Sequence, residues 1–110
     1  MAKKVPARIR KLMKELKEGL ALIYKDKLKA VYLYGSYARG DAQSDSDLDV
    51  MIVLNNYESY GKEIDRTGEL ASKLSLEYGV SVSRVVMKES QWKAGDTPLL
   101  RNIRTHGIPA

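Results

Sequence analysis

One stretch of this chain, residues 35–54, constrains its fold most. It opens on the dipeptide Gly35-Ser36, and after ten intervening residues Asp47 and Asp49 stand at the head of an almost unbroken apolar run. A β-branched and aromatic run ends at Gly35, so the pattern predicts a strand, a tight turn and a second strand. Since side chains alternate along a strand, Asp47 and Asp49 should share one face and leave the other face for the core.

Hydrophobic periodicity predicts that helices and strands alternate along the whole chain. The expected helices span about residues 6–25, a short turn at 36–39, a stretch ending at Gly79, about 89–93 and about 98–106, and the expected strands span 28–34, 47–54 and about 80–87. No repeat, linker or low-complexity segment interrupts them. We therefore expect residues 1–110 to form a single α/β domain.

Composition narrows the classes of protein further. Of the 110 residues, 44% are apolar and 30% charged, which is typical of a globular domain and not of a membrane protein or a disordered chain. Cysteine is absent, which excludes disulfides and a thiol nucleophile and fits a reducing compartment. The basic N-terminal segment does not lead into the apolar stretch of a signal peptide, so we expect a cytoplasmic protein.

Positive charge is concentrated in the first part of the chain. The net charge is +5, and residues 1–40 contain Lys or Arg at eleven positions against three acids. Such a helix surface could attract RNA, an acidic protein or a nucleotide, but most charged helix faces are simply solvated. RNA is the less favoured partner, because the chain has no room for a separate RNA-binding domain.

The two aspartates and the turn indicate metal and nucleotide chemistry. Two adjacent carboxylates repel each other unless a cation neutralises them, and Mg²⁺ binds through one or two carboxylates together with substrate phosphates. Gly35 lets the backbone approach a ligand closely, while the Ser36 hydroxyl and the following amides can donate to phosphate oxygens. Arg39 either contacts a phosphate or is solvated.

Other interpretations of the motif fail on detail. A calcium loop starting at Asp45 would need glycine where Val50 stands and glutamate at its twelfth position. The chain contains neither a Gly-Lys-Ser/Thr loop nor a Gly-x-Gly-x-x-Gly fingerprint. The aromatic residues are expected to pack more often than to stack on a base, and His106 is expected to be structural. These aromatic residues are Tyr32, Tyr34, Tyr37 and Trp92.

The phrases Gly-Ser-Tyr-Ala-Arg-Gly (35–40) and Ser-Asp-Ser-Asp-Leu-Asp-Val (44–50) resemble the signature of the minimal nucleotidyltransferases of the DNA polymerase β superfamily, the MntA-like antitoxins that pair with HEPN toxins. The resemblance extends to the tail at 98–107. It implies a small palm-like domain with a mixed sheet of three to four strands packed against helices. It also implies ATP as substrate, with Ser36 on the triphosphate and Asp47 and Asp49 as catalytic metal ligands.

The same resemblance implies a third carboxylate on the next strand, and the alignment puts Ser83 there, or Ser81 if the register shifts. A serine cannot replace an anionic ligand or base, so we expect one Mg²⁺ ion, and a second ion stays open. Two functions follow. The chain either transfers AMP from ATP to a tyrosine of a HEPN partner, or neutralises that partner by direct binding without catalysis.

Overall fold

The computed structural model describes residues 5–110. Along the chain the elements are α1 (Ala7–Tyr24), η2 (Lys25–Lys27), β1 (Leu28–Tyr34), α2 (Ser36–Arg39), β2 (Leu48–Leu54), α3 (Tyr60–Tyr78), β3 (Val82–Lys88), α4 (Glu89–Ala94), α5 (Pro98–His106) and β4 (Ile108–Pro109). The sheet order is β3-β2-β1-β4. Strand β2 runs parallel to β3 and antiparallel to β1. The predicted mixed α/β architecture is confirmed.

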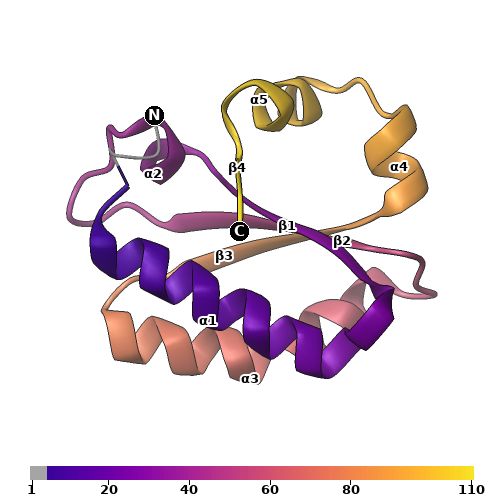
Figure 1. The fold of residues 1–110 in the computed structure, drawn as a ribbon, viewed down its shortest axis with the longest axis horizontal. Coiled ribbons are helices and arrows are strands. Elements are labelled where there is room, and N and C mark those ends of the chain that lie inside the picture. The colour runs from indigo at the N-terminus through magenta and orange to yellow at the C-terminus, as the bar shows by residue number, and fades with distance from the viewer. Residues whose placement is uncertain (1–4) are drawn as a thin grey trace.

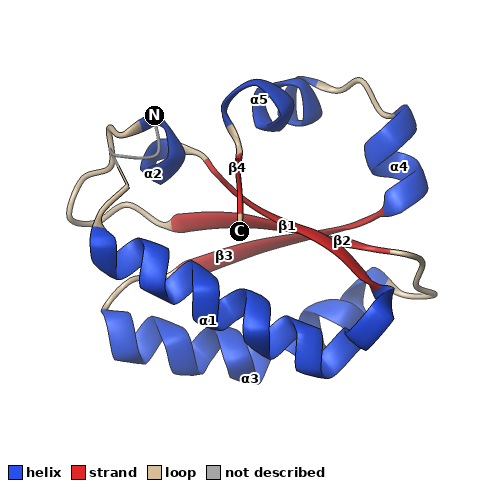
Figure 2. Ribbon diagram, viewed as in Figure 1, coloured by secondary structure: helices blue, strands red, loops and turns tan. Residues whose placement is uncertain are grey.

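Helices cover both faces of the sheet (Figure 1). Helices α1 and α3 lie along one face, and α4 and α5 lie over the other, as the view coloured by secondary structure also shows (Figure 2). The inner strand β2 serves both layers because its side chains alternate. Its even-numbered residues, Leu48 to Leu54, join the large cluster under α1 and α3, whereas Met51 and Val53 join a smaller cluster with Leu100 and Ile103 of α5.

Three details differ from the sequence-based expectation. Helix α1 begins at Ala7 because Pro6 has an extended backbone with ψ of 147°. Helix α5 ends before Gly107, a residue expected to cap it as glycines do in the left-handed conformation, but Gly107 has φ of −66° and is needed because a Cβ would collide with the Ile103 carbonyl. Strand β4 was not predicted, because two residues that include Pro109 carry no periodic signal.

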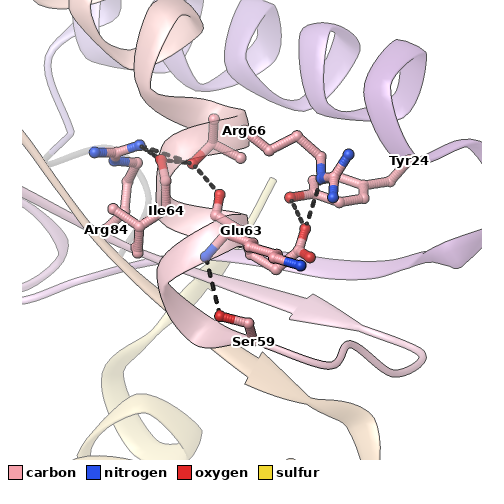
Figure 3. Close-up of polar contacts among 8 residues, drawn as sticks. Tyr24, Ser59, Glu63, Ile64, Arg66 and Arg84 are labelled. Atoms are coloured by element: carbon pink, nitrogen blue, oxygen red, sulfur yellow. Dashed lines mark hydrogen bonds and ion pairs between the residues drawn. The ribbon is translucent and has the colours of Figure 1, made fainter.

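A polar cluster joins α1 to α3 at the end of the sheet remote from Asp49 (Figure 3). Glu63 is only 7% exposed, and its Oε1 accepts hydrogen bonds from the Tyr24 hydroxyl at 2.8 Å and from Arg66 Nε at 3.0 Å. Arg84 of β3 reaches the same helix and donates through Nη1 to Thr67 Oγ1 at 2.7 Å. These contacts fix α3 against both α1 and the outer strand β3.

Strand β3 is the edge of the sheet next to β2, and side chains bind several of its outward-facing backbone groups. The Val82 amide donates to Ser75 Oγ at 3.2 Å, and the Val86 carbonyl accepts from the Tyr57 hydroxyl at 3.3 Å. Such contacts blunt an edge that could otherwise pair with another strand. Within residues 5–110, no helix combines the length and apolar character needed to cross a bilayer.

Candidate active site

The turn after β1 depends on Gly35. Its backbone has φ of 76° and ψ of −154°, a region that is essentially restricted to glycine. A Cβ at this position would also collide with Oδ2 of Asp49 and lie 3.2 Å from its Cγ. Gly35 therefore brings the main chain of the turn directly against the Asp49 carboxylate.

Ser36 begins the four-residue helix α2, which Gly40 ends in the left-handed conformation. The amides of Ala38 and Arg39 both donate back to the Gly35 carbonyl at 3.1 Å. The amides of Ser36 and Tyr37 come before these two, and the first amides of a helix have no acceptor within the helix. The Tyr37 side chain is buried in the core and anchors the turn. Ser36 thus directly follows the glycine that lies against Asp49, which brings the first amides of α2 near the acidic end of β2.

The two aspartates lie at the start of β2 with different exposure. Asp47 comes directly before the strand and is exposed, while Asp49 is the second strand residue and is half-buried. Burial raises the pKa of the Asp49 carboxyl, and the negative charge of Asp47 raises it further, whereas the charge of Arg39 lowers it. Keeping both carboxylates ionised costs free energy, and a bound cation would offset that cost.

Ser83 is the neighbour of Asp49 on β3. The parallel register pairs Asp49 with Ser83, and the Leu48 amide donates to the Ser81 carbonyl at 2.8 Å just before that ladder. Paired residues of adjacent strands project to the same face of a sheet. The side chain that stands beside Asp49 on this strand is therefore the exposed hydroxyl of Ser83, and Ser81 lies outside the strand.

The two carboxylates of Asp47 and Asp49 suit a cation whose remaining ligands come from a substrate. Within residues 5–110, no group of three or more His, Cys, Asp or Glu side chains could hold a metal ion. Two carboxylate groups with phosphate oxygens and water are nevertheless the usual surroundings of Mg²⁺ in nucleotide sites. Asp47 and Asp49 fit such an ion, and phosphate oxygens held at Ser36 would supply further ligands.

Arg39 stands at the rim of this arrangement. It is exposed and forms an ion pair with Asp41, Nε to Oδ2 at 3.4 Å. Its positive charge still reaches the Asp49 carboxyl, where it lowers the pKa. An exposed ion pair of this kind is weak, so Arg39 can exchange Asp41 for a phosphate at small cost.

The aromatic candidates separate into packed residues and one residue of the site. The ring centroids of Tyr32 and Trp92 are 5.1 Å apart, so these two rings pack on each other. The Arg104 guanidinium also lies against Trp92, 4.7 Å from the centroid of its ring. Tyr34, by contrast, pairs with Asp49 across the antiparallel ladder, and burial followed by the charge of Asp49 raises the pKa of its hydroxyl. Tyr34 was expected from the sequence to pack, and its place beside Asp49 follows only from the register of β1 and β2. His106 is exposed at the end of α5, remote in sequence from the turn.

An inner strand that presents acids beside a phosphate-sized turn is the arrangement used by domains that transfer nucleotides. The sequence from residue 9 to residue 106 matches the family model described as nucleotidyltransferase domain, and the chain belongs to that family. Members generally use a nucleoside triphosphate and a divalent metal ion.

Relatives support this membership. A provisionally named protein adenylyltransferase of Methanocaldococcus jannaschii is 35% identical over 97 residues, which are 88% of this chain and 93% of that protein. A solved structure of a provisionally named nucleotidyltransferase from Sulfolobus solfataricus superposes with a TM-score of 0.65 at 24% identity, over 93% of this chain and 80% of the other. A toxin-antitoxin structure with AMP-PNP gives 0.60 at 24% identity, over 86% and 68%. The two structures establish the fold.

Proposed function

We propose that this protein binds Mg²⁺-ATP and transfers AMP to a tyrosine hydroxyl of a HEPN-type toxin, acting as its antitoxin. The observation that carries the proposal is the close approach of Gly35 to the Asp49 carboxylate, with Asp47 directly before β2 and near enough for its charge to raise the pKa of Asp49. The name of the similar protein from M. jannaschii, a protein adenylyltransferase, supports a protein as the acceptor. The cytoplasmic location expected from the sequence stays a prediction.

In this reaction the acceptor oxygen bonds to the α-phosphorus of ATP, the bond from that phosphorus to the bridging oxygen breaks, and pyrophosphate leaves. Ser36 and the first amides of α2 would hold the triphosphate, and Asp47 and Asp49 would hold Mg²⁺. When bound, the ion supplies positive charge to the leaving pyrophosphate. Asp47 and Asp49 would be engaged with the ion and Ser83 is no base, so the acceptor proton would pass to solvent water. We propose one ion, since Asp47 and Asp49 are the two carboxylates of the site.

The test is transfer of label from α-³²P-ATP to the partner in the presence of Mg²⁺. Asp47→Asn and Asp49→Asn should each lower transfer by at least 100-fold, roughly the loss seen when a group that stabilises transition-state charge is removed. Asp45→Asn is the matched control, because Asp45 is an exposed acid of the same loop and should retain transfer. Absence of labelling by the unaltered protein, with intact binding of its partner, would contradict the proposal.

A second candidate function is neutralisation of the partner by contact alone, and the hydroxyl of Ser83 beside Asp49 favours it. The double variant Asp47→Asn with Asp49→Asn separates the two functions in cells. Contact neutralisation survives this change, whereas neutralisation by AMP transfer is lost. Ser83→Asp supplies a carboxylate next to Asp49 and should raise label transfer if the missing acid limits turnover; an unchanged rate argues that it does not.

A further inference from the structure

An apolar pocket with a basic rim lies between α1 and the short strand β4. Its volume is about 380 Å³, and its floor is formed by Val5, Met13, Leu33 and Ile108. The first three are at most 5% exposed, so the floor is part of the core surface. A pocket of this size lies at the lower end of the range for ligand sites and admits one or two large side chains.

Three cations surround the opening, against the single acid Glu18. Arg10 Nη1 donates to the Val5 carbonyl at 2.9 Å, and Lys17 Nζ donates to the main-chain oxygen of Ala110 at 2.6 Å. Lys14 is exposed between them. Among residues 5–110, the ion pairs involve none of these three side chains. Glu18 offsets one of the three charges, so the lining keeps an excess of positive charge at the mouth of an apolar cavity.

We propose that this pocket docks an acidic segment of a partner protein, which inserts an apolar side chain between α1 and β4 and places carboxylates on Arg10, Lys14 and Lys17. Charge complementarity selects this occupant. A second copy of the chain would bring a net charge of +5 to a positive rim, and residues 1–4 would bring Lys3 and Lys4. Both would be repelled by the same three cations.

The place of the pocket gives the docked segment a consequence for the candidate active site. Leu33 of the pocket floor stands two residues before Gly35, a separation of roughly 7 Å along a strand. A partner held there approaches the turn from the face opposite Asp49, because Leu33 packs into the large core cluster while its neighbour Tyr34 pairs with Asp49. That this partner is the acceptor of AMP rests on the proposed function, whereas its binding to the pocket does not.

The binding test uses a fluorescein-labelled decapeptide in which a leucine-tryptophan pair separates two runs of four glutamates, followed by fluorescence anisotropy without ATP. Lys14→Glu should weaken binding at least 10-fold. Lys11→Glu is the matched control, because it changes the net charge equally on the same helix but does not line the pocket, and it should stay within 3-fold of the unaltered protein. Replacing the leucine-tryptophan pair by glycines should also weaken binding at least 10-fold.

Several outcomes would overturn the proposal. Equal losses from Lys14→Glu and Lys11→Glu would show unspecific charge attraction. Undiminished binding of the glycine peptide would exclude insertion of an apolar side chain, and binding of laurate without binding of the peptide would indicate a fatty-acid pocket. A chain beginning at Val5 that bound the peptide 10-fold more tightly would show that residues 1–4 occupy the pocket. Failure of label transfer with intact peptide binding contradicts only the proposed function.

Discussion

Gly35 excludes a side chain because its φ is positive and because a Cβ would collide with the Asp49 carboxylate. A second glycine, Gly79, allows the cost of the positive φ to be measured alone. Gly79 also has a positive φ, 66°, but a Cβ there meets nothing within 4 Å. Gly79→Ala should therefore cost about 1–2 kcal/mol of the free energy of unfolding, the strain of the left-handed region alone. Gly35→Ala should cost about 3 kcal/mol or more, because the strain is greater and the Asp49 carboxylate must move. Urea denaturation measures both, and equal losses would contradict the collision with Asp49.

The raised pKa of Asp49 predicts how the stability of the protein changes with pH. The folded protein holds the Asp49 proton more tightly than the unfolded chain does, so ionisation of this group destabilises the fold as pH rises past its ordinary range. In the absence of metal, Asp49→Asn should stabilise the protein at pH 7 by less than about 1 kcal/mol, since the carboxyl is partly exposed.

The gain in stability from Asp49→Asn should shrink below about pH 4. There the pH is below the ordinary pKa of an aspartate, so the carboxyl is protonated in the unfolded chain as well as in the folded protein. Thermal unfolding at several pH values measures this, with Asp45→Asn as the exposed control. If Asp49→Asn instead lowered stability at pH 7 in metal-free buffer, the prediction would be wrong, because the Asp49 carboxylate would then make favourable contacts within the protein.

The proximity of individual residues in the candidate site could be predicted from the sequence where the signal is local. Gly35, Ser36, Asp47 and Asp49 stand within one strand-turn-strand pattern, so their juxtaposition follows from chain geometry. Tyr34 could be placed next to Asp49 only through the antiparallel register of β1 and β2, which no local pattern specifies. The apolar pocket draws on Met13 and Ile108, which are distant in sequence, and had no sequence signal at all.

At the scale of elements, the long helices and strands were predictable because each repeats its period several times, whereas the contacts that join them were not. Glu63 illustrates the limit. A glutamate in the first turn of a helix indicates a surface position and a favourable dipole. The structure buries it under Tyr24, a residue 39 positions earlier, so its environment depends on how α1 and α3 meet.

The Glu63 cluster predicts the strength of that junction (Figure 3). Tyr24→Phe removes one of the two donors to Glu63 Oε1 and leaves a buried carboxylate with Arg66 alone, which should cost about 1–3 kcal/mol. Tyr60→Phe is the control, because Tyr60 opens α3 with 45% exposure and should change stability by less than about 0.5 kcal/mol. Similar effects of the two substitutions in urea denaturation would contradict a structural role of the Tyr24 hydroxyl.

At the scale of the whole molecule, the sheet separates two layers of unequal size. The layer of α1 and α3 contains the large core, and the opposite layer rests on the small cluster of Met51, Val53, Leu100 and Ile103. The candidate site lies on this second face, since Asp49, Met51 and Val53 alternate with the residues of the large core. The face that carries the candidate site is thus the one with less buried apolar surface to stabilise it.

This asymmetry predicts a hierarchy of opening. Regions with few buried apolar contacts open at lower free energy, so amides of α4 and α5 should exchange with deuterium well before those of α1 and α3. Ile103→Ala should lose about 2–4 kcal/mol of packing in the small cluster and accelerate exchange in α5. If the layers open separately, protection in α1 should fall much less. Mass spectrometry of the exchanged protein measures both, and equal acceleration in α1 and α5 would show that the two layers unfold as one unit.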